Sequence, residues 1–310
     1  MIHLMYTFMT GLGLYGGSRG KKWLKDRIRI YKQFVVPSLI AQTNQNFIVW
    51  VSFRPEDKGN KDIYELQDYL IRIFSSDRVV FTYSGVCIYD DKYPDEVAKD
   101  RLMMALHGSM HELVNYVTED TVLMTVQPSD DCYHSGMVDE MQTLFKNTDY
   151  QAIGYQHGYI MNYQTLEGKE YNPKTNPPFV TVRFDKHTFM DPFRHGQYTS
   201  LKHDVGKYKK GTPVPSHEYY GDCFKYLVLP KRGFLVGTHG QNISTHFNNP
   251  YAGDSVTIPN IFGLELVKPI KIRYSIRKHI LTKLPYRVQR KLRYIFGEKC
   301  YQTIYKFIHG

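Results

Sequence analysis

Two adjacent carboxylates, Asp130 and Asp131, follow closely on an apolar, β-branched segment, residues 122–127. Such a segment is typical of a buried strand, and in open α/β sheets ligands bind beyond the carboxyl ends of the strands. Adjacent carboxylates repel each other unless a cation or a hydrogen-bond donor offsets them. A hard divalent ion that also binds phosphate oxygens is a common partner of such a pair. The alternative is a solvated turn that carries two acids.

Histidine and asparagine side chains gather in a second polar segment, residues 238–246, which follows the apolar residues 233–236. Such side chains after a strand can complete a metal shell or bind sugar hydroxyls. His239 is the preferred candidate for a ligand role, ahead of His246. The alternative for both is a structural hydrogen bond inside the fold.

Two further carboxylates, Glu218 and Asp222, lie in a polar and aromatic segment, residues 216–222. A carboxylate in such a cleft can act as a general base toward a hydroxyl group. A helix cap or an ion-pair partner is the alternative, and we consider it the more common use of such residues.

A glycine-rich segment, residues 10–20, contains a G-x-G-x-x-G motif. A dinucleotide site would also need an acid about 20 residues further on, at the end of the next strand. The acid that follows the next predicted strand is Glu56, across an unusually long helix. We therefore interpret the segment as a glycine loop near a nucleotide, with Ser18 and Arg19 placed to contact phosphate at a helix start. A solvated basic turn is the alternative.

Hydrophobic periodicity places these segments among alternating strands and helices. The predicted strands cover residues 3–9, 46–53, 78–83, 122–127, 150–163 and 179–184, and the predicted helices cover residues 21–42, 62–74, 95–117 and 136–147. Residues 225–229 and 233–236 are predicted to be two short strands, or a strand and a turn. Pro37 interrupts the first helix, while residues 164–178 and 188–217 are predicted to be polar loops. The alternation up to residue 127 predicts an α/β fold with a mostly parallel sheet and helices on both faces.

The composition is that of an ordinary globular protein, with 42% hydrophobic and 23% charged residues. The four cysteines, at positions 87, 132, 223 and 300, form no C-x-x-C pair. Their spacing favours a reducing compartment over a disulfide framework or a zinc site. Because the sequence shows neither a signal peptide nor an apolar run of about 20 residues, we expect a cytoplasmic protein.

The net charge of +10 is concentrated near the C-terminus. Residues 268–310 contain twelve Lys or Arg and one acid, Glu298, whereas the rest of the chain is nearly neutral. Apolar residues recur there at helical spacing, which predicts a basic amphipathic tail over residues 264–310 after a domain over residues 1–263. Such a tail suits peripheral association with an anionic membrane surface. A packed helix pair with a solvated basic face is the alternative, and nucleic acid is the least favoured partner.

Two segments, residues 27–47 with their F-V-V-P-S-L motif and residues 232–242, resemble the rhamnosyltransferase-like family of GT-A-type glycosyltransferases. The paired acids stand where that family carries an acidic motif, and Gln127 and Pro128 replace an earlier acid of the motif. The resemblance covers about residues 1–250, so the basic tail lies outside it.

This resemblance implies a GT-A-like fold and a glycosyltransferase that uses a nucleoside-diphosphate sugar. An Mn²⁺ or Mg²⁺ ion held by Asp130, Asp131 and His239 would neutralise the diphosphate leaving group. Glu218 or Asp222 would deprotonate a hydroxyl of a glycan or lipid-linked acceptor. The residues expected at the donor site are Ser18, Arg19, Asp95, Arg101 and Asp130. The family name suggests rhamnose as the transferred sugar.

Two other functions are compatible with the same residues. A nucleotidyltransferase would use the glycine-rich segment with Arg19 and Lys21 to hold a triphosphate. A non-catalytic binding protein would instead use the basic tail as its binding surface. Release of a nucleoside diphosphate, release of pyrophosphate, or binding without turnover would separate the three.

Overall fold

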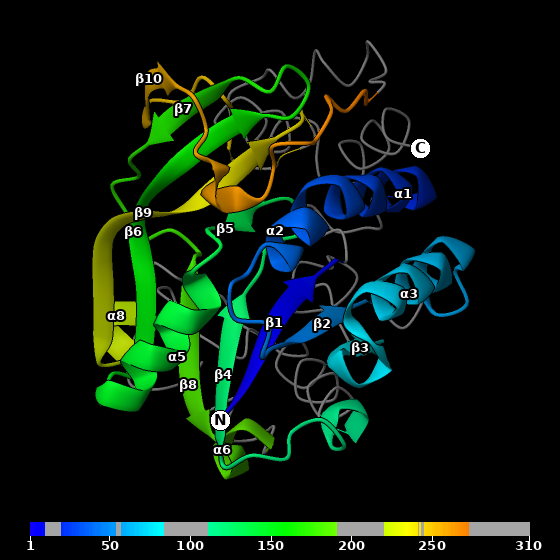
Figure 1. Ribbon diagram of the computed structural model, residues 1–310, viewed down its shortest axis with the longest axis vertical. Helices are drawn as coiled ribbons and strands as arrows, with labels where there is room; N and C mark the ends of the chain where they lie inside the picture. The colour runs from blue at the N-terminus through cyan, green and yellow to red at the C-terminus, as the bar shows by residue number, and fades with distance from the viewer. Residues whose placement is uncertain are drawn as a thin grey trace, which may run out of the picture.

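The computed structural model describes residues 1–9, 20–53, 57–83, 111–190, 220–240, 242 and 245–272. In this part of the chain ten strands form one curled sheet with helices packed against it (Figure 1). The strands are β1 (Ile2–Phe8), β2 (Ile48–Ser52), β3 (Val79–Thr82), β4 (Thr121–Val126), β5 (Cys132–Tyr133), β6 (Ala152–Asn162), β7 (Gly168–Tyr171), β8 (Val180–Asp185), β9 (Tyr226–Thr238) and β10 (Ala252–Val256). The helices and helical turns are α1 (Gly20–Ile30), η1 (Tyr31–Val35), α2 (Val36–Ile40), α3 (Lys61–Phe74), η3 (Ser76–Arg78), α5 (Met137–Asn147), α6 (Lys186–Met190), α8 (Tyr220–Cys223) and η5 (Asn260–Phe262). The predicted α/β class is thereby confirmed.

The first half of the sheet is parallel, as predicted. β1 lies between β2 and β4, and β3 extends the sheet beyond β2. The chain therefore builds outward from β1 on one side and then returns to place β4 on the other side. Such a reversal leaves a crevice between the carboxyl ends of the two central strands, where ligands of open α/β sheets bind. In this sheet the strand order reverses between β1 and β4, so a ligand is expected beside the carboxyl ends of these two strands.

The second half of the sheet is mixed rather than parallel. β8 pairs antiparallel with β4 and with β6, β7 pairs antiparallel with β6, and β9 runs parallel to β6. Antiparallel neighbours need no crossover helix, and short connections join β6 to β7 and β7 to β8. β7 falls in a segment predicted as a loop because its sequence, Gly-Lys-Glu-Tyr, is polar.

One long strand, β9, replaces the two short strands predicted over residues 225–236. Pro230 and the exposed Lys231 interrupt the apolar pattern there. The pairing with β6 shifts register at Tyr155, His157 and Gly158, so the strand bends without ending. Such bulges accommodate residues that break the regular alternation.

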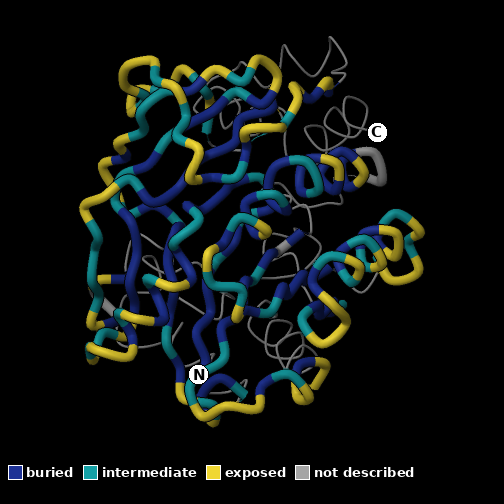
Figure 2. Tube along the Cα trace, in the orientation of Figure 1, coloured by how far each residue is buried: buried dark blue, intermediate teal, exposed yellow. Residues whose placement is uncertain are grey.

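The core has two main layers, because successive residues of a strand face opposite sides of the sheet. Met5 and Val49 pack on the side of α1, α3 and α5. Leu4 and Trp50 pack on the other side, where residues 113–117, α6 and α8 lie. Figure 2 shows the buried strands running through the middle of the molecule with the exposed loops at its outside.

The first predicted helix is continuous from α1 to α2 but widens into a π-helical turn at η1. The N–H of Val36 bonds to the carbonyl of Tyr31, five residues earlier. Pro37 lacks an N–H, and in a regular helix its ring would collide with a carbonyl of the preceding turn. The wide turn immediately before Pro37 accommodates the proline without ending the helix.

The other helices in the described ranges follow the predictions where they can be compared. α3 and α5 match the helices predicted over residues 62–74 and 136–147. Asn60 caps α3 by accepting a hydrogen bond from the backbone of Asp62. The predicted helix over residues 95–117 lies largely outside the described residues.

The C-terminal part of the described chain packs on the body of the protein. Leu264, Ile270 and Ile272 are buried against Phe34 and Tyr163 in a third apolar cluster. The predicted boundary between residues 263 and 264 stays a prediction, and residues 273–310 lie outside the described ranges. No helix in the described ranges is long and apolar enough to cross a membrane.

Candidate active site

The paired acids lie in the short loop between β4 and β5, beside the carboxyl end of β4. Gln127 closes this loop, since its side-chain N–H groups donate to the carbonyls of Pro128 at 3.0 Å and of Asp131 at 2.8 Å. Tyr163, the residue after β6, holds the loop from another side, because its hydroxyl donates to the carbonyl of Asp130 at 2.9 Å. The loop conformation is therefore fixed from two sides.

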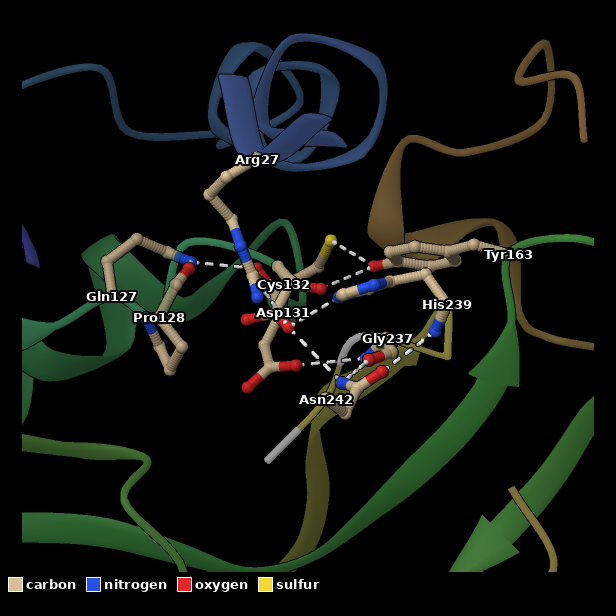
Figure 3. Close-up of polar contacts among 10 residues, drawn as sticks. Arg27, Gln127, Pro128, Asp131, Cys132, Tyr163, Gly237, His239 and Asn242 are labelled. Atoms are coloured by element: carbon tan, nitrogen blue, oxygen red, sulfur yellow. Dashed lines mark hydrogen bonds and ion pairs between the residues drawn. The ribbon is translucent and has the colours of Figure 1, made fainter. Parts of the chain in front are cut away.

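Three side chains converge on one carboxylate oxygen of Asp130. Figure 3 shows these three, Arg27, His239 and Asn242, pointing toward one another. Arg27 reaches Oδ2 from α1 at 2.5 Å. His239 Nε2 lies 2.9 Å from the same atom, and Asn242 Nδ2 lies 3.2 Å from it. Both come from the segment that follows β9, so helix α1 and the end of β9 are tied together through Asp130.

The second carboxylate, Asp131, is buried and bonded to the end of β9. Its Oδ1 accepts a hydrogen bond of 2.9 Å from the backbone N–H of Gly237. A Cβ atom at position 237 would collide with the carbonyl of Asp130 and with the ring of Tyr163. Only glycine lets the strand approach the acids this closely.

The two carboxylates have opposite pKa shifts. Burial by itself would raise the pKa of Asp130, but the charge of Arg27 and the hydrogen bond from His239 outweigh it and hold this pKa below its ordinary value. Burial and then the charge of Asp130 raise the pKa of Asp131 well above its ordinary value. The surroundings of the pair therefore favour ionisation of Asp130 over ionisation of Asp131.

The imidazole of His239 is neutral at pH 7, because burial and the charge of Arg27 lower its pKa. Its Nε2 faces the ionised Asp130, which can only accept, so Nε2 carries the ring's proton. The neighbouring Asn242 is oriented by two backbone bonds: its Oδ1 accepts from His239 N at 2.8 Å and its Nδ2 donates to Gly237 O at 2.6 Å.

The donor atoms suit a divalent ion in kind, but their arrangement does not fit one. Arg27 already lies where a cation would pair with Asp130, and His239 presents an N–H to this carboxylate instead of a lone pair. Among the residues that the structure describes, no group of three or more His, Cys, Asp or Glu side chains is placed to hold a metal ion. The metal role of Asp130, Asp131 and His239 stays a prediction.

The structure brings together three of the predicted site residues, Asp130, Asp131 and His239. The backbone of Asp222 lies in α8, just before β9 begins, whereas the acids contact the residues at the other end of β9. The role of Asp222 as a base stays a prediction, and its side chain is not described. Five further candidates lie outside the described residues: Ser18, Arg19, Asp95, Arg101 and Glu218.

Sequence analysis missed the site roles of Arg27, Asn242 and Gly237. A signal for Arg27 was present, because this residue lies on the buried face of its helix, three residues after Leu24 and four before Tyr31. A charged residue in such an apolar stripe needs a buried partner. Asn242 lies in the polar segment 238–246 that the sequence marked, but its contact with Asp130, like the role of Gly237, depends on where β9 ends.

No family model and no curated protein sequence matches this chain. The crystal structure of residues 1–349 of TarS from S. aureus, in complex with UDP-GlcNAc, matches with a TM-score of 0.39 and 9% identity over 78% of this chain and 60% of that chain. A protein from Desulfovibrio desulfuricans G20 assigned as a nucleotide-diphospho-sugar transferase matches with a TM-score of 0.33 and 15% identity over 74% of this chain and 80% of that one.

A nucleoside-diphosphate-sugar pyrophosphorylase from Vibrio cholerae RC9 matches with a TM-score of 0.37 and 11% identity, over 76% of this chain and 95% of that one. This chain spans only 60% of the TarS segment that it matches. Likenesses of this strength do not assign a function, which has to follow from the chain's own site. Membership of the rhamnosyltransferase-like family stays a prediction.

Proposed function

We propose that this protein is a glycosyltransferase, which moves a sugar from a nucleoside-diphosphate sugar to a hydroxyl group of an acceptor. The observation that carries the proposal is the position of Asp130, Asp131 and Arg27 beside the carboxyl end of β4, where the strand order reverses between β1 and β4. Ligands bind at this place in open α/β sheets. Carboxylates beside a guanidinium provide both kinds of contact that a sugar diphosphate needs.

The two kinds of contact follow from the chemistry of the donor. Sugar hydroxyls donate hydrogen bonds, which the carboxyl oxygens of Asp130 and Asp131 can accept. The diphosphate offers only acceptors and negative charge, which Arg27 can meet. As the bond to the sugar breaks, charge develops on the diphosphate, so a fixed positive group at this position stabilises the transition state.

The finer features of the reaction are part of the proposal. Glu218 or Asp222 would deprotonate the acceptor hydroxyl, and Ser18 and Arg19 would lie near the nucleotide. We propose a glycan or lipid-linked acceptor, with rhamnose as one candidate sugar. The basic residues 268–310 would contact an anionic membrane surface.

The test is a screen of purified protein with uridine, guanosine and thymidine diphosphate sugars, in which release of the nucleoside diphosphate is measured. Asp131→Ala should lower the release by about 100-fold or more, since it removes a group that contacts the donor. Asp254→Ala is the matched control, because this acid is exposed on β10, away from the paired acids. It should leave the rate unchanged.

Three results would contradict the proposal. Equal release in Asp131→Ala and Asp254→Ala, with both variants folded, would remove the paired acids from the site. Pyrophosphate release from a nucleoside triphosphate and a sugar phosphate would indicate a nucleotidyltransferase instead. Absence of binding to every sugar nucleotide would indicate a function outside both classes.

A further inference from the structure

We infer that Arg27 takes the place of the divalent cation at the donor site, so that the diphosphate is bound and neutralised by a guanidinium and not by a metal ion. The inference rests on the proposed function, and it specifies how the negative charge of the donor is met. Three observations support it. Arg27 is buried beside Asp130, its guanidinium has hydrogen-bonding capacity that it does not use, and Asp130 Oδ2 already accepts three contacts.

The position of Arg27 is fixed within the protein. Its side chain extends from α1 toward the acidic loop, which we define as residues 127–131 between β4 and β5, as Figure 3 shows. Its Nη1 lies 2.5 Å from Asp130 Oδ2. The guanidinium also lies over the ring of Trp23, 5.0 Å from the ring centroid. Only 4% of the residue is exposed. A cation held this firmly needs no reorganisation when an anion binds.

The guanidinium of Arg27 carries an N–H donor that its ion pair with Asp130 does not use. Arginine carries five N–H donors, and the ion pair with Asp130 uses one of its terminal nitrogens. Arg27 Nε is buried and has no hydrogen-bond partner among the residues that the structure describes. A buried donor without a partner is costly, and an acceptor from a ligand would remove that cost. Phosphate oxygens have the geometry that a guanidinium prefers.

A divalent ion would have to compete for a carboxylate that is already satisfied. Asp130 Oδ2 accepts from Arg27, His239 and Asn242 at once. An ion bound there would sit beside the positive guanidinium and in front of the N–H of His239. Both contacts are repulsive, so metal binding would require Arg27 to leave its buried position.

A buried acceptor beside the paired acids, Gln127 Oε1, also has hydrogen-bonding capacity that the described residues do not use. Gln127 places its N–H groups on two backbone carbonyls, which leaves Oε1 buried without a hydrogen-bond partner in the described part of the chain. An orphaned donor at Arg27 and an orphaned acceptor at Gln127 flank the same acidic loop. A ligand that carries both phosphate oxygens and hydroxyl groups would satisfy both.

The experiment is a binding titration of the full chain with UDP, GDP and dTDP, by calorimetry, in EDTA and again in Mn²⁺. We expect binding of at least one nucleoside diphosphate in EDTA, with the affinity unchanged by Mn²⁺. Arg27→Lys keeps a positive charge beside Asp130 but loses the guanidinium, and it should weaken binding by about 10-fold or more. Arg29→Met is the matched control on the same helix, since Arg29 is half exposed and pairs only with Asp26 among the described residues; its affinity should equal that of the wild type.

A second variant covers the case in which Arg27→Lys keeps enough charge to bind. Arg27→Met/Asp130→Asn removes both members of the ion pair, so no buried charge is left uncompensated. With its melting curve still cooperative, this variant should lose binding by about 100-fold relative to Arg29→Met. Binding as tight as in the control would overturn the inference.

The metal dependence separates the inference from the proposed function. If the wild type binds a nucleoside diphosphate only in Mn²⁺, the donor site stands but the inference about Arg27 is wrong. If no nucleoside diphosphate or sugar nucleotide binds in either buffer, the proposed function fails together with the inference. Binding in EDTA that is lost in the Arg27 variants and kept in Arg29→Met supports both.

Discussion

At the scale of single residues, Gly237 decides how closely β9 approaches the acids. Gly237→Ala would place a methyl group against the carbonyl of Asp130 and the ring of Tyr163. Since both neighbours belong to the site or support it, we expect a loss of about 1–3 kcal/mol in the free energy of unfolding and weaker donor binding. Denaturant unfolding and calorimetry would measure the two effects.

Gly221 provides the control for this substitution. It lies in α8, and a Cβ atom there would meet its nearest neighbour, the ring of Tyr226, only at 4.0 Å. Gly221→Ala should therefore leave donor binding unchanged and alter stability little. Equal effects of the two substitutions would mean that the close approach at position 237 does not hold the acids in place.

The contrast between Asp130 and Arg27 shows which site residues a sequence reveals. The two acids were predictable because they directly follow a strand, where ligands bind. Arg27 lies about 100 residues earlier in a helix, and its contact with Asp130 depends on how that helix packs over the sheet. Its place in an apolar stripe marked it as unusual, but nothing in the sequence named its partner.

At the scale of secondary structure, a polar row crosses three strands inside the core. His3 Nε2 in β1 lies 2.6 Å from Thr125 Oγ1 in β4, which in turn lies 2.6 Å from Thr181 Oγ1 in β8. The row joins the parallel and antiparallel halves of the sheet. Burial lowers the pKa of His3 from 6.5 to about 3, so its ring stays neutral in the folded protein.

This depressed pKa predicts how stability depends on pH. Below pH 6.5 the imidazole of His3 binds a proton in the unfolded chain but not in the folded chain. The contribution of neutral His3 to the free energy of unfolding is therefore complete above pH 6.5 and is lost as the pH falls toward 3. The free energy of unfolding should fall by up to about 1.4 kcal/mol per pH unit in this window. His3→Gln, which cannot titrate, should flatten the dependence in denaturant unfolding measured from pH 7 downward.

Glu140 of α5 supplies a comparison with a different pH window. Burial opposes its ionisation, but hydrogen bonds from His134, Lys231 and Tyr155 outweigh it and lower its pKa from 4.5 to about 2. Its contribution is present above pH 4.5 and is lost below that pH. Glu140→Gln should therefore change the slope only below pH 4.5, and a slope that changes at the same pH in both variants would rule out the assignment to His3.

The secondary structure itself was predictable where apolar periodicity was strong. β1, β2, β3, β4, α3 and α5 lie within a few residues of their predicted ranges. The polar strand β7 was missed because it pairs at the outer part of the sheet, where side chains need not be apolar. β9 was divided in two because Pro230 and Lys231 break the pattern at a bulge, which depends on pairing with β6.

At the scale of the whole molecule, the C-terminal segment of the described chain, residues 264–272, packs against residues that support the candidate site. The N–H of Ile270 donates to the carbonyl of Tyr163 at 2.8 Å, and the hydroxyl of Tyr163 donates to the carbonyl of Asp130. The ring of Tyr163 stacks on Phe34 of η1, with centroids 3.6 Å apart. Residues 264–272 are therefore connected through Tyr163 to the loop that carries Asp130 and Asp131, and the composition of the tail did not predict this connection.

Substitutions at Ile270 and Leu266 would test this connection through their effect on the free energy of unfolding. Ile270 is buried, with 2% exposed, and Ile270→Ala should lower the free energy of unfolding by about 2–5 kcal/mol, because a cavity would open beside Phe34 and Tyr163. Leu266, four residues earlier and 94% exposed, is the matched control, and Leu266→Ala should change stability by less than about 0.5 kcal/mol. Denaturant unfolding of both variants gives the comparison. If the C-terminal segment were a separate tail, both substitutions would be equally mild; a large effect of Ile270→Ala alone, together with weaker donor binding, would make this segment part of the domain that holds the acids.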